Sequence, residues 1–429
     1  MAGRLLIRGG RVVDPGSGRD EQADLLIEGG VVAALERPGV LPEDGTDTID
    51  ATGLVVAPGL IDMHVHLREP GYEYRETVYT GCRSAVAGGV TSVACMANTN
   101  PVNDNASVTG LILEKSREAA LANVFPIGAV SVALEGKKMA KFGEMYEAGI
   151  VAVSDDGHPV MDSALMRRAL EYSRMFGFPV IAHEEDAYLS CSGVINEGFT
   201  SVKLGLKGIP GAAESAMVAR DIEILRLTGG HLHVAHVSTA EAVEMVRNAK
   251  RAGLRVTAEV TPHHFTLDES VVEGFKTNAK MNPPLRNRRD VEAVREGLAD
   301  GTIDTIATDH APHHRDEKDS EMDRAPFGIV GLETLLPLSL ALVRDGAVSL
   351  PRALAAMTVA PAANLGLDRG TLLLGAVADV TVFDPDLEWR FDASLAESKS
   401  SNSPFDGWPM CGRAIHTIVG GRRVWENPR

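Results

Sequence analysis

The sequence lacks any apolar run that approaches the length of a membrane span, which needs about 18 consecutive apolar residues. Its N-terminal segment, "MAGRLLIRGGRVVDPGSG", also lacks a long apolar block followed by a small-residue cleavage site, so we expect no secretory signal. Together these absences predict a protein without a membrane partner.

The sequence also has few cysteines and no net positive charge. The four cysteines, Cys82, Cys95, Cys191 and Cys411, lie far apart and form no C-x-x-C pair. Such thiols suit a reducing compartment without a disulfide framework, so we expect a cytoplasmic location. The formal net charge is −17, which argues against nucleic acid as a partner. A local positive site could still bind an acidic small molecule.

The chain does contain enough apolar sequence, 44% of 429 residues, for one large domain and a smaller one. From about residue 55 to 366, short apolar runs ending in polar residues alternate with segments whose apolar residues recur at helical spacing. Eight strand–helix alternations predict an α/β fold of the (β/α)8 TIM-barrel type. An open doubly wound sheet is the alternative, but polar residues follow nearly every run, which favours the barrel. The eight runs are "GLIDMHVHL", "VTSVACMANT", "NVFPIGAV", "GIVAVSDDG", "FPVIAHEED", "HLHVAHVST", "RVTAEVTPHH" and "TIDTIATDHAP".

Both ends of the chain have a different texture. They contain hairpin-like strands around Gly-Gly turns, as in "LLIRGGRVVD" and "AIHTIVGGRRVWE". We therefore predict a small β-sandwich domain built from residues 1–56 and 368–429, and a catalytic barrel domain over residues 57–367. A charged stretch, residues 313–328, follows the eighth run. Such a stretch is ordinarily a solvated loop, but at the active-site face of a barrel it predicts a mobile cover.

Histidine and aspartate gather at the ends of five of these runs. Alternate residues of a strand share a face, so His64, His66 and Arg68 point to one side of the first strand. Taken alone, each residue has a simple structural explanation: His236 as a core histidine, Asp156 as a turn residue. Barrel strands, however, end at one common rim, and imidazoles with carboxylates and no thiolate suit Zn²⁺. We therefore predict a catalytic metal site from six residues: His64, His66, Asp156, His183, His236 and Asp309.

Eight motifs resemble the dihydroorotases of the large bacterial type, within the amidohydrolase superfamily, over nearly the whole chain. They are "DMHVHLREPG", "MANTNP", "SDDG", "IAHEED", "VAHVST", "MNPPLR", "TDHAPH" and "PFGIVGLET". The first and seventh are fairly specific, whereas "HVH" alone indicates only the superfamily. The resemblance implies zinc-dependent, reversible cyclisation of N-carbamoyl-L-aspartate to L-dihydroorotate with release of water, the third step of pyrimidine synthesis.

The resemblance also implies roles for individual residues. It gives His64 and His66 to a first zinc, His183 and His236 to a second, Asp156 as the carboxylate that bridges or supports both, and Asp309 as the catalytic aspartate and a further ligand. Arg68 and Asn98 resemble the pair that grips the substrate carboxylate. The full set of implied substrate contacts is His66, Arg68, Asn98, Asn282, His313, Phe327 and Gly328.

One departure leaves the metal count open. Hydantoinase-like relatives and some dihydroorotases bridge two zinc ions with a carboxylated lysine on the fourth strand, but "GIVAVSDDG" has no lysine. One or two zinc ions per subunit fit, and two are favoured. The alternative functions are a hydantoinase- or allantoinase-like cyclic amidohydrolase and a non-catalytic scaffold subunit for aspartate transcarbamoylase. A homodimer and an association with aspartate transcarbamoylase are further open expectations.

Overall fold

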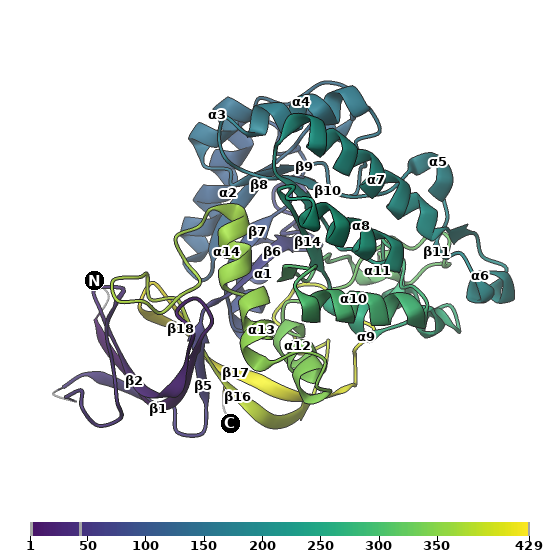
Figure 1. Cartoon of the computed structure of the whole chain (residues 1–429). Coiled ribbons are helices and arrows are strands. Elements are labelled where there is room, and N and C mark those ends of the chain that lie inside the picture. The colour runs from purple at the N-terminus through teal and green to yellow at the C-terminus, as the bar shows by residue number, and fades with distance from the viewer. Residues whose placement is uncertain (1–2, 43–44, 428–429) are drawn as a thin grey trace.

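A sheet of eight parallel strands surrounded by helices forms the largest part of the computed structural model, which describes residues 3–42 and 45–427 (Figure 1). The strands follow one another around the sheet in chain order, and Val65 and His310 form a parallel bridge that brings its two edges together. This confirms the predicted barrel, because each of the eight apolar runs contains one strand. The strands are β6 (Leu60–Val65), β7 (Val90–Cys95), β8 (Asn123–Gly128), β9 (Ala152–Ser154), β10 (Val180–Ala182), β13 (Leu232–Val234), β14 (Val256–Val260) and β15 (Thr305–Ile306).

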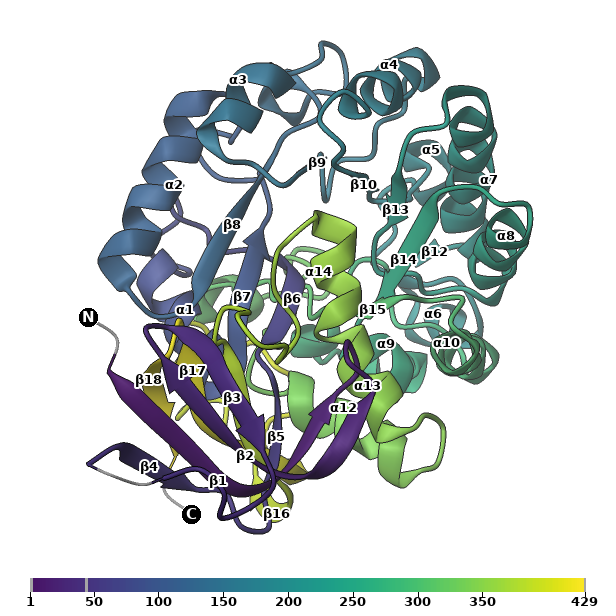
Figure 2. The ribbon, with the colours of Figure 1, turned by 60° about the vertical axis from the view of Figure 1, so that its left-hand side comes forward.

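Most helices lie around the outside of the barrel, and those between β6 and β15 belong to the connections between successive strands, whereas α14 (Val359–Leu365) crosses the middle of the ring in Figure 2. Several begin at side-chain caps that the sequence supplies, such as Asp162 and Asn287, which accept hydrogen bonds from the first turn. Among the described residues, no helix combines the length and the apolar character that crossing a membrane requires. The helices are α1 (Val78–Ala87), α2 (Ala106–Ala119), α3 (Phe142–Ala148), α4 (Ser163–Ser173), α7 (Gly211–Thr228), α8 (Ala240–Arg251), α10 (Arg288–Asp300), α12 (Leu335–Arg344), α13 (Leu350–Ala356) and α14 (Val359–Leu365), with shorter α5 (Ala187–Ser190), α6 (Phe199–Leu204), α9 (Pro262–Thr266) and α11 (Arg315–Lys318) and the strand pair β11 (Ile195–Asn196) and β12 (Gly208–Ile209).

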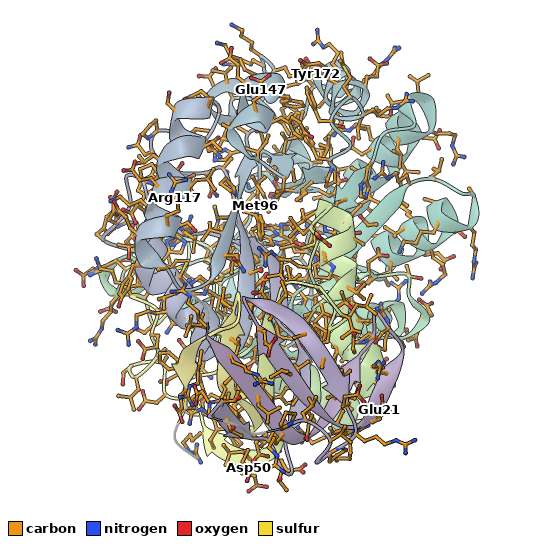
Figure 3. The ribbon with its side chains drawn as sticks, turned by 90° about the vertical axis from the view of Figure 1, so that its left-hand side faces the viewer. Glu21, Asp50, Met96, Arg117, Glu147 and Tyr172 are labelled. Carbon is orange, nitrogen blue, oxygen red and sulfur yellow. The ribbon has the colours of Figure 1, made fainter. Side chains whose placement is uncertain are left out.

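The interior of the barrel is filled by apolar side chains. Met63, Ala94, Ile127 and Ala152 belong to one buried cluster, which also includes Met96. Figure 3 labels Met96 inside the ring of helices, whereas Arg117 and Glu147 lie on the outer helices. Residues of the opposite register pack beneath the helices, as the two-residue period of a strand requires. The barrel is therefore mainly a packed apolar core, and the predicted ligands lie at one end of it.

Strands from both ends of the chain form a second sheet of eight strands with mixed directions. The two termini meet where β16 pairs antiparallel with β5, placing Val382 opposite Val56. This confirms the expected β-rich unit from both termini. The domain boundaries stay a prediction, and residues 1–2, 43–44 and 428–429 of the small domain lie outside the described residues. The strands are β1 (Arg4–Asp14), β2 (Arg19–Glu28), β3 (Val31–Glu36), β4 (Asp47–Asp50), β5 (Val55–Pro58), β16 (Val380–Arg390), β17 (Pro409–Val419) and β18 (Arg422–Glu426).

Candidate metal centre

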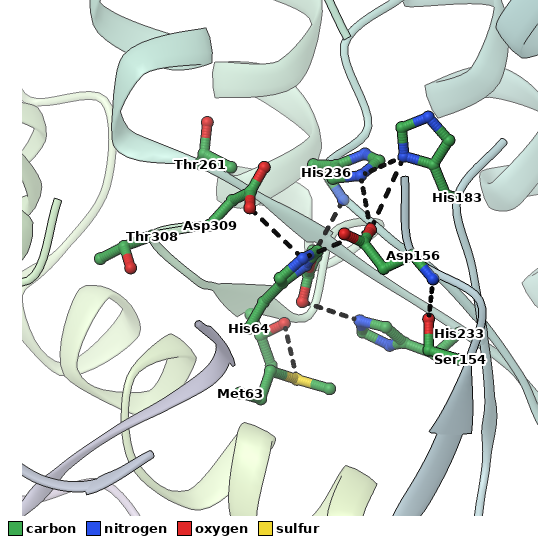
Figure 4. A network of polar contacts seen from close by, with 12 residues as sticks. Met63, His64, Ser154, Asp156, His183, His233, His236, Thr261, Thr308 and Asp309 are labelled. Carbon is green, nitrogen blue, oxygen red and sulfur yellow. Dashed lines mark hydrogen bonds and ion pairs between the residues drawn. The ribbon is translucent and has the colours of Figure 1, made fainter. Parts of the chain in front are cut away.

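The six predicted ligands come from five different strand ends, and the fold gathers them at one rim of the barrel. Figure 4 labels His64, Asp156, His183, His236 and Asp309 at this rim. Each lies within the last two residues of a strand or the first three after it, where the polypeptide leaves the apolar interior. We call this set the metal-ligand cluster. His64 lies in β6 and His66 follows it; Asp156 follows β9, His183 follows β10, His236 follows β13 and Asp309 follows β15.

A first group of potential ligand atoms belongs to His64, His66, Asp156 and Asp309, all buried and all within 4.8 Å of one another. His64 Nε2 lies 3.4 Å from an oxygen of Asp156 and 3.4 Å from one of Asp309. His66 Nε2 lies 2.9 Å from Asp309 Oδ1 and 3.4 Å from Asp156 Oδ2. Two imidazole nitrogens therefore face two carboxylates across a gap of a size that a metal ion could occupy.

A second group consists of Asp156, His183 and His236. His183 Nδ1 lies 2.9 Å from His236 Nε2, and Asp156 Oδ1 lies 3.3 Å from His236 Nε2 and 3.6 Å from His183 Nδ1. Figure 4 shows Asp156 between His64 on one side and the two histidines on the other. Because Asp156 belongs to both groups, the geometry suits two neighbouring cations that share one carboxylate.

The chemistry of the donors fits a divalent transition metal. His64 Nε2 is fully buried and has no hydrogen-bond partner among the described residues. Burial lowers the pKa of His64, but the carboxylates of Asp156, Glu259 and Asp309 outweigh burial and raise it well above its usual value. Such an excess of negative charge around a buried imidazole is the environment that a bound cation would neutralise. Imidazole nitrogen and carboxylate oxygen are donors that Zn²⁺ accepts.

Glu259 is a functional residue that the sequence interpretation missed. It is fully buried in β14, where its Oε1 lies 2.5 Å from His64 Nδ1 and its Oε2 lies 3.2 Å from His233 Nε2. Burial opposes its ionisation, but the two histidines hold its pKa below the ordinary value. A carboxylate on Nδ1 of a ligating histidine fixes the ring and leaves Nε2 for the metal. The available signal was a single charged residue in the strand "VTAEV".

Glu185 is a second residue that was missed, and it supports the other half of the cluster. Its Oε2 lies 3.0 Å from His183 Nε2 and accepts a 2.7 Å hydrogen bond from Asn282 Nδ2. Burial raises the pKa of Glu185, but the contacts with His183 and Asn282 outweigh it and lower the pKa to about 2. The carboxylate therefore stays charged at neutral pH and joins a cluster histidine to a predicted substrate contact.

A cavity of about 320 Å³ opens above the cluster. His66, Asp156, His183 and Asp309 reach its lining, whereas His64 is completely buried outside it. The other predicted substrate contacts surround the same space or border it, and we call them the substrate rim. The rim comprises Arg68, Asn98, Asn282, His313 and Phe327, which line the cavity, and Gly328, which adjoins Phe327.

Arg68 reaches this cavity from a loop, because β6 ends at Val65. Its backbone has a φ of 62°, and Asp309 and His236 also lie in the left-handed region, with φ of 47° and 32°. Non-glycine residues rarely adopt this region, and such conformations concentrate at functional sites. Three of the predicted site residues thus share a strained backbone at one rim.

The charge and hydrogen bonding of the rim suit an anionic, polar ligand. Arg68 Nε donates to the carbonyl of Pro312 at 3.2 Å, which holds the guanidinium at the cavity. Burial, together with the positive side chains of Arg68, Arg75 and Lys318, lowers the pKa of His313 to about 2. His313 is therefore a neutral imidazole at neutral pH, and Arg68 carries the positive charge at this side of the cavity.

Sequence comparisons match this chain to named proteins over almost its full length. The family described as "DHOase: Dihydro-orotase-like" matches residues 53–242. A protein of Citrifermentans bemidjiense called dihydroorotase is 56% identical over 98% of this chain and 99% of its own length. One from Anaeromyxobacter sp. (strain K), also called dihydroorotase, is 55% identical over 99% of both chains.

Solved structures share the fold at lower sequence identity. The L-hydantoinase (dihydropyrimidinase) from Arthrobacter aurescens has a TM-score of 0.87 and 26% identity, covering 100% of this chain and 97% of its own. Hydantoinases thus share the architecture of this chain. The relatives that are more than 50% identical to it are called dihydroorotases. Sequence identity therefore distinguishes the dihydroorotases from the hydantoinases, which the fold alone does not.

Proposed function

Because this chain belongs to the dihydroorotase family, we propose that its barrel rim catalyses the zinc-dependent, reversible cyclisation of N-carbamoyl-L-aspartate to L-dihydroorotate. The observation that carries this proposal is the pair of buried ligand groups sharing Asp156 beneath a cavity lined by Arg68. The metal ligands, the acid–base group of Asp309 and the carboxylate-binding side chain of Arg68 would all act on the same cyclic amide. His64, His66, Asp156, His183, His236 and Asp309 would hold the metal, with two ions favoured because Asp156 is shared.

Bound zinc would supply hydroxide at neutral pH by lowering the pKa of water, and would polarise the carbonyl under attack. The protein must then manage the proton. Asp309 would accept the proton of the attacking water and deliver it to the departing ring nitrogen. In the cyclising direction, the same carboxylate would take a proton from the ureido nitrogen. The 2.9 Å distance between Asp309 Oδ1 and His66 Nε2 supports this role, since it places the carboxylate beside a nitrogen that would hold the metal.

The substrate rim would orient the ring. Arg68 offers a planar guanidinium that can grip a carboxylate at two points, which lysine cannot reproduce. Asn98 accepts from His66 Nδ1 at 2.8 Å and lines the cavity next to Arg68. Asn282 lines it from another loop, where Glu185 anchors its amide. These three side chains would bind the ring substituents and hold the scissile amide over the cluster.

The test is an assay of the purified, zinc-loaded chain with dihydroorotate and with hydantoin. We expect hydrolysis of dihydroorotate and little or none of hydantoin. Preference for hydantoin would reassign the chain to the other cyclic-amide hydrolases. A chain that binds no zinc and hydrolyses neither compound would instead support the scaffold alternative.

The homodimer, the association with aspartate transcarbamoylase and the cytoplasmic location stay predictions. The homodimer and the association with aspartate transcarbamoylase can be tested in one experiment. Analytical ultracentrifugation of the purified chain, alone and mixed with aspartate transcarbamoylase from the same organism, would give the mass of each species. A monomer that does not co-sediment would contradict both.

A further inference from the structure

A segment from the C-terminal part of the chain crosses the rim of the barrel beside the site. Residues 397–403, which we call the strap, lie between β16 and β17. Ser398 Oγ donates to Glu76 Oε2 at 2.5 Å, and Ser400 Oγ donates to the carbonyl of Arg75 at 2.7 Å. The strap is therefore bonded to the loop that follows β6, which carries Arg68.

Asn402 of the strap is bonded to a second loop, the one that follows β15. Its Nδ2 donates to the carbonyls of Ala311 and Gly328, both at 3.0 Å. Its Oδ1 accepts from the backbone N–H of His313 at 3.0 Å, and its carbonyl accepts from Val330 N at 3.0 Å. The side chain is 3% exposed. One buried amide thus satisfies backbone groups on both sides of the charged stretch 313–328.

These bonds fix the base of the loop that carries two parts of the substrate rim. Gly328 sits so tightly that a Cβ there would lie 2.6 Å from Ala311 O and 2.7 Å from His313 Cδ2. Gly328 O also accepts from Lys318 Nζ at 3.1 Å, so Asn402 and Lys318 hold the same carbonyl. The two chain segments therefore meet directly beside His313, which lines the cavity.

We propose that Asn402 is a positioning residue, which sets the substrate rim by clamping the two ends of the 313–328 loop and the strap together. It lines a neighbouring cavity of about 390 Å³ together with His313, and none of the predicted metal ligands lines that cavity. It therefore acts on substrate binding through His313 and Gly328. The kinetic part of this inference rests on the proposed dihydroorotase reaction, but the structural part does not.

The structural part is tested by hydrogen exchange of the full-length, zinc-loaded chain. Asn402→Ala should make backbone amides within residues 311–330 exchange at least tenfold faster. Asn402→Asp keeps the volume and the acceptor for His313 N–H but loses both donors, and it should have the same effect. Asn427→Ala is the matched control, since Asn427 is a buried asparagine that donates to Ala414 O at 2.8 Å in the terminal sheet. Unchanged exchange of residues 311–330 in both Asn402 variants would overturn the proposal.

The kinetic part is tested with the same variants on dihydroorotate. Both Asn402 variants should raise KM at least tenfold while kcat changes less than threefold and zinc content stays equal to wild type. Asn427→Ala should leave both parameters unchanged. A loss confined to kcat, or equal kinetic losses in the control, would show that Asn402 does not position the substrate rim. If the wild-type chain does not turn over dihydroorotate, the proposed function fails, while the exchange measurement still decides the role of Asn402.

Discussion

The metal-ligand cluster and the substrate rim lie next to each other but are positioned in different ways. The cluster sits on strand ends or within three residues of them, so the hydrogen-bonded register of the barrel places its atoms. The rim sits on loops that are joined by side chains from distant parts of the chain, such as Asn402 to Ala311 and Arg75 to Glu317. The cluster is thus part of the scaffold, and the rim is assembled on it.

This difference predicts a separation of effects. Changes in the cluster should alter zinc binding or the chemical step, because its atoms surround the metal and the reacting bond. Changes in the rim should alter substrate binding, because its atoms meet groups that do not react. Four substitutions test this separation.

The largest effect is expected in the cluster, at Asp309. Asp309→Asn keeps the size of the side chain but cannot carry the proton, so kcat should fall by about 10³-fold. Zinc content, measured by elemental analysis, should change little because the other five ligands remain. A kcat within tenfold of wild type in the zinc-loaded variant would remove Asp309 from the role of proton carrier.

The next effect is expected behind the cluster, at Glu259. Glu259→Gln replaces the negative partner of His64 Nδ1 with a neutral amide, and such changes weaken metal affinity by about 10- to 100-fold. Competition with a chromogenic chelator would measure this, and excess zinc should restore most of the activity. An affinity equal to that of wild type would show that Glu259 only fills space.

A smaller effect is expected in the rim, at Arg68. Arg68→Lys keeps the charge but loses the planar pair of donors, so KM for dihydroorotate should rise about tenfold, equivalent to about 1.4 kcal/mol of binding. The value of kcat and the zinc content should change much less. Steady-state kinetics beside elemental analysis would decide, and a fall in zinc content would contradict the division between cluster and rim.

The smallest effect is expected at Lys318, which forms hydrogen bonds to the loop that carries part of the substrate rim. Its Nζ donates to the carbonyls of Pro326 and Gly328 at 2.9 and 3.1 Å. Lys318→Met removes these bonds, whose net contribution to stability is about 1 kcal/mol each. Because Lys318 holds the loop and does not touch the substrate, only part of this loss should appear in binding, as a rise in KM of about threefold. An unchanged KM would mean that Asn402 alone holds the loop.

Lys318 also gives the stability of the protein a defined pH dependence. Burial, with a further contribution from Lys280, lowers the pKa of Lys318 to about 7, whereas the ordinary value is 10.5. Between these values the unfolded chain binds a proton that the folded chain has released, so the free energy of unfolding rises with pH. The stability of wild type relative to Lys318→Met should therefore be greater at pH 9 than at pH 7 in urea unfolding. Equal differences at the two pH values would contradict this.

The barrel fold was predictable from the sequence for a physical reason, and so was the fact that the residues of the metal-ligand cluster come together. Strand ends such as "VIAHEED" and "IATDHAP" are local patterns, and closure of a parallel sheet brings such ends together whatever the helices do. Asp156 and His236 looked ordinary one at a time, and only their shared place at the strand ends distinguished them. Their individual roles stay predictions.

The supporting residues could not be predicted in the same way. Glu259 lies within an apolar strand, and which histidine it meets depends on barrel packing between β14 and β6. Asn402 lies 91 residues from Ala311 along the chain, in a segment that sequence assigned to the small terminal domain. Contacts of this kind are set by how parts of the chain far apart in sequence pack together, and no local pattern encodes that.

The central claim, that the cluster holds a metal which the reaction needs, has one direct test. Dihydroorotate hydrolysis by the purified chain should be measured before chelation, after chelation and after zinc is added back. Activity should be lost with the zinc and return with it, while the fold, followed by circular dichroism, is kept. Full activity in a protein shown by elemental analysis to contain no metal would contradict it.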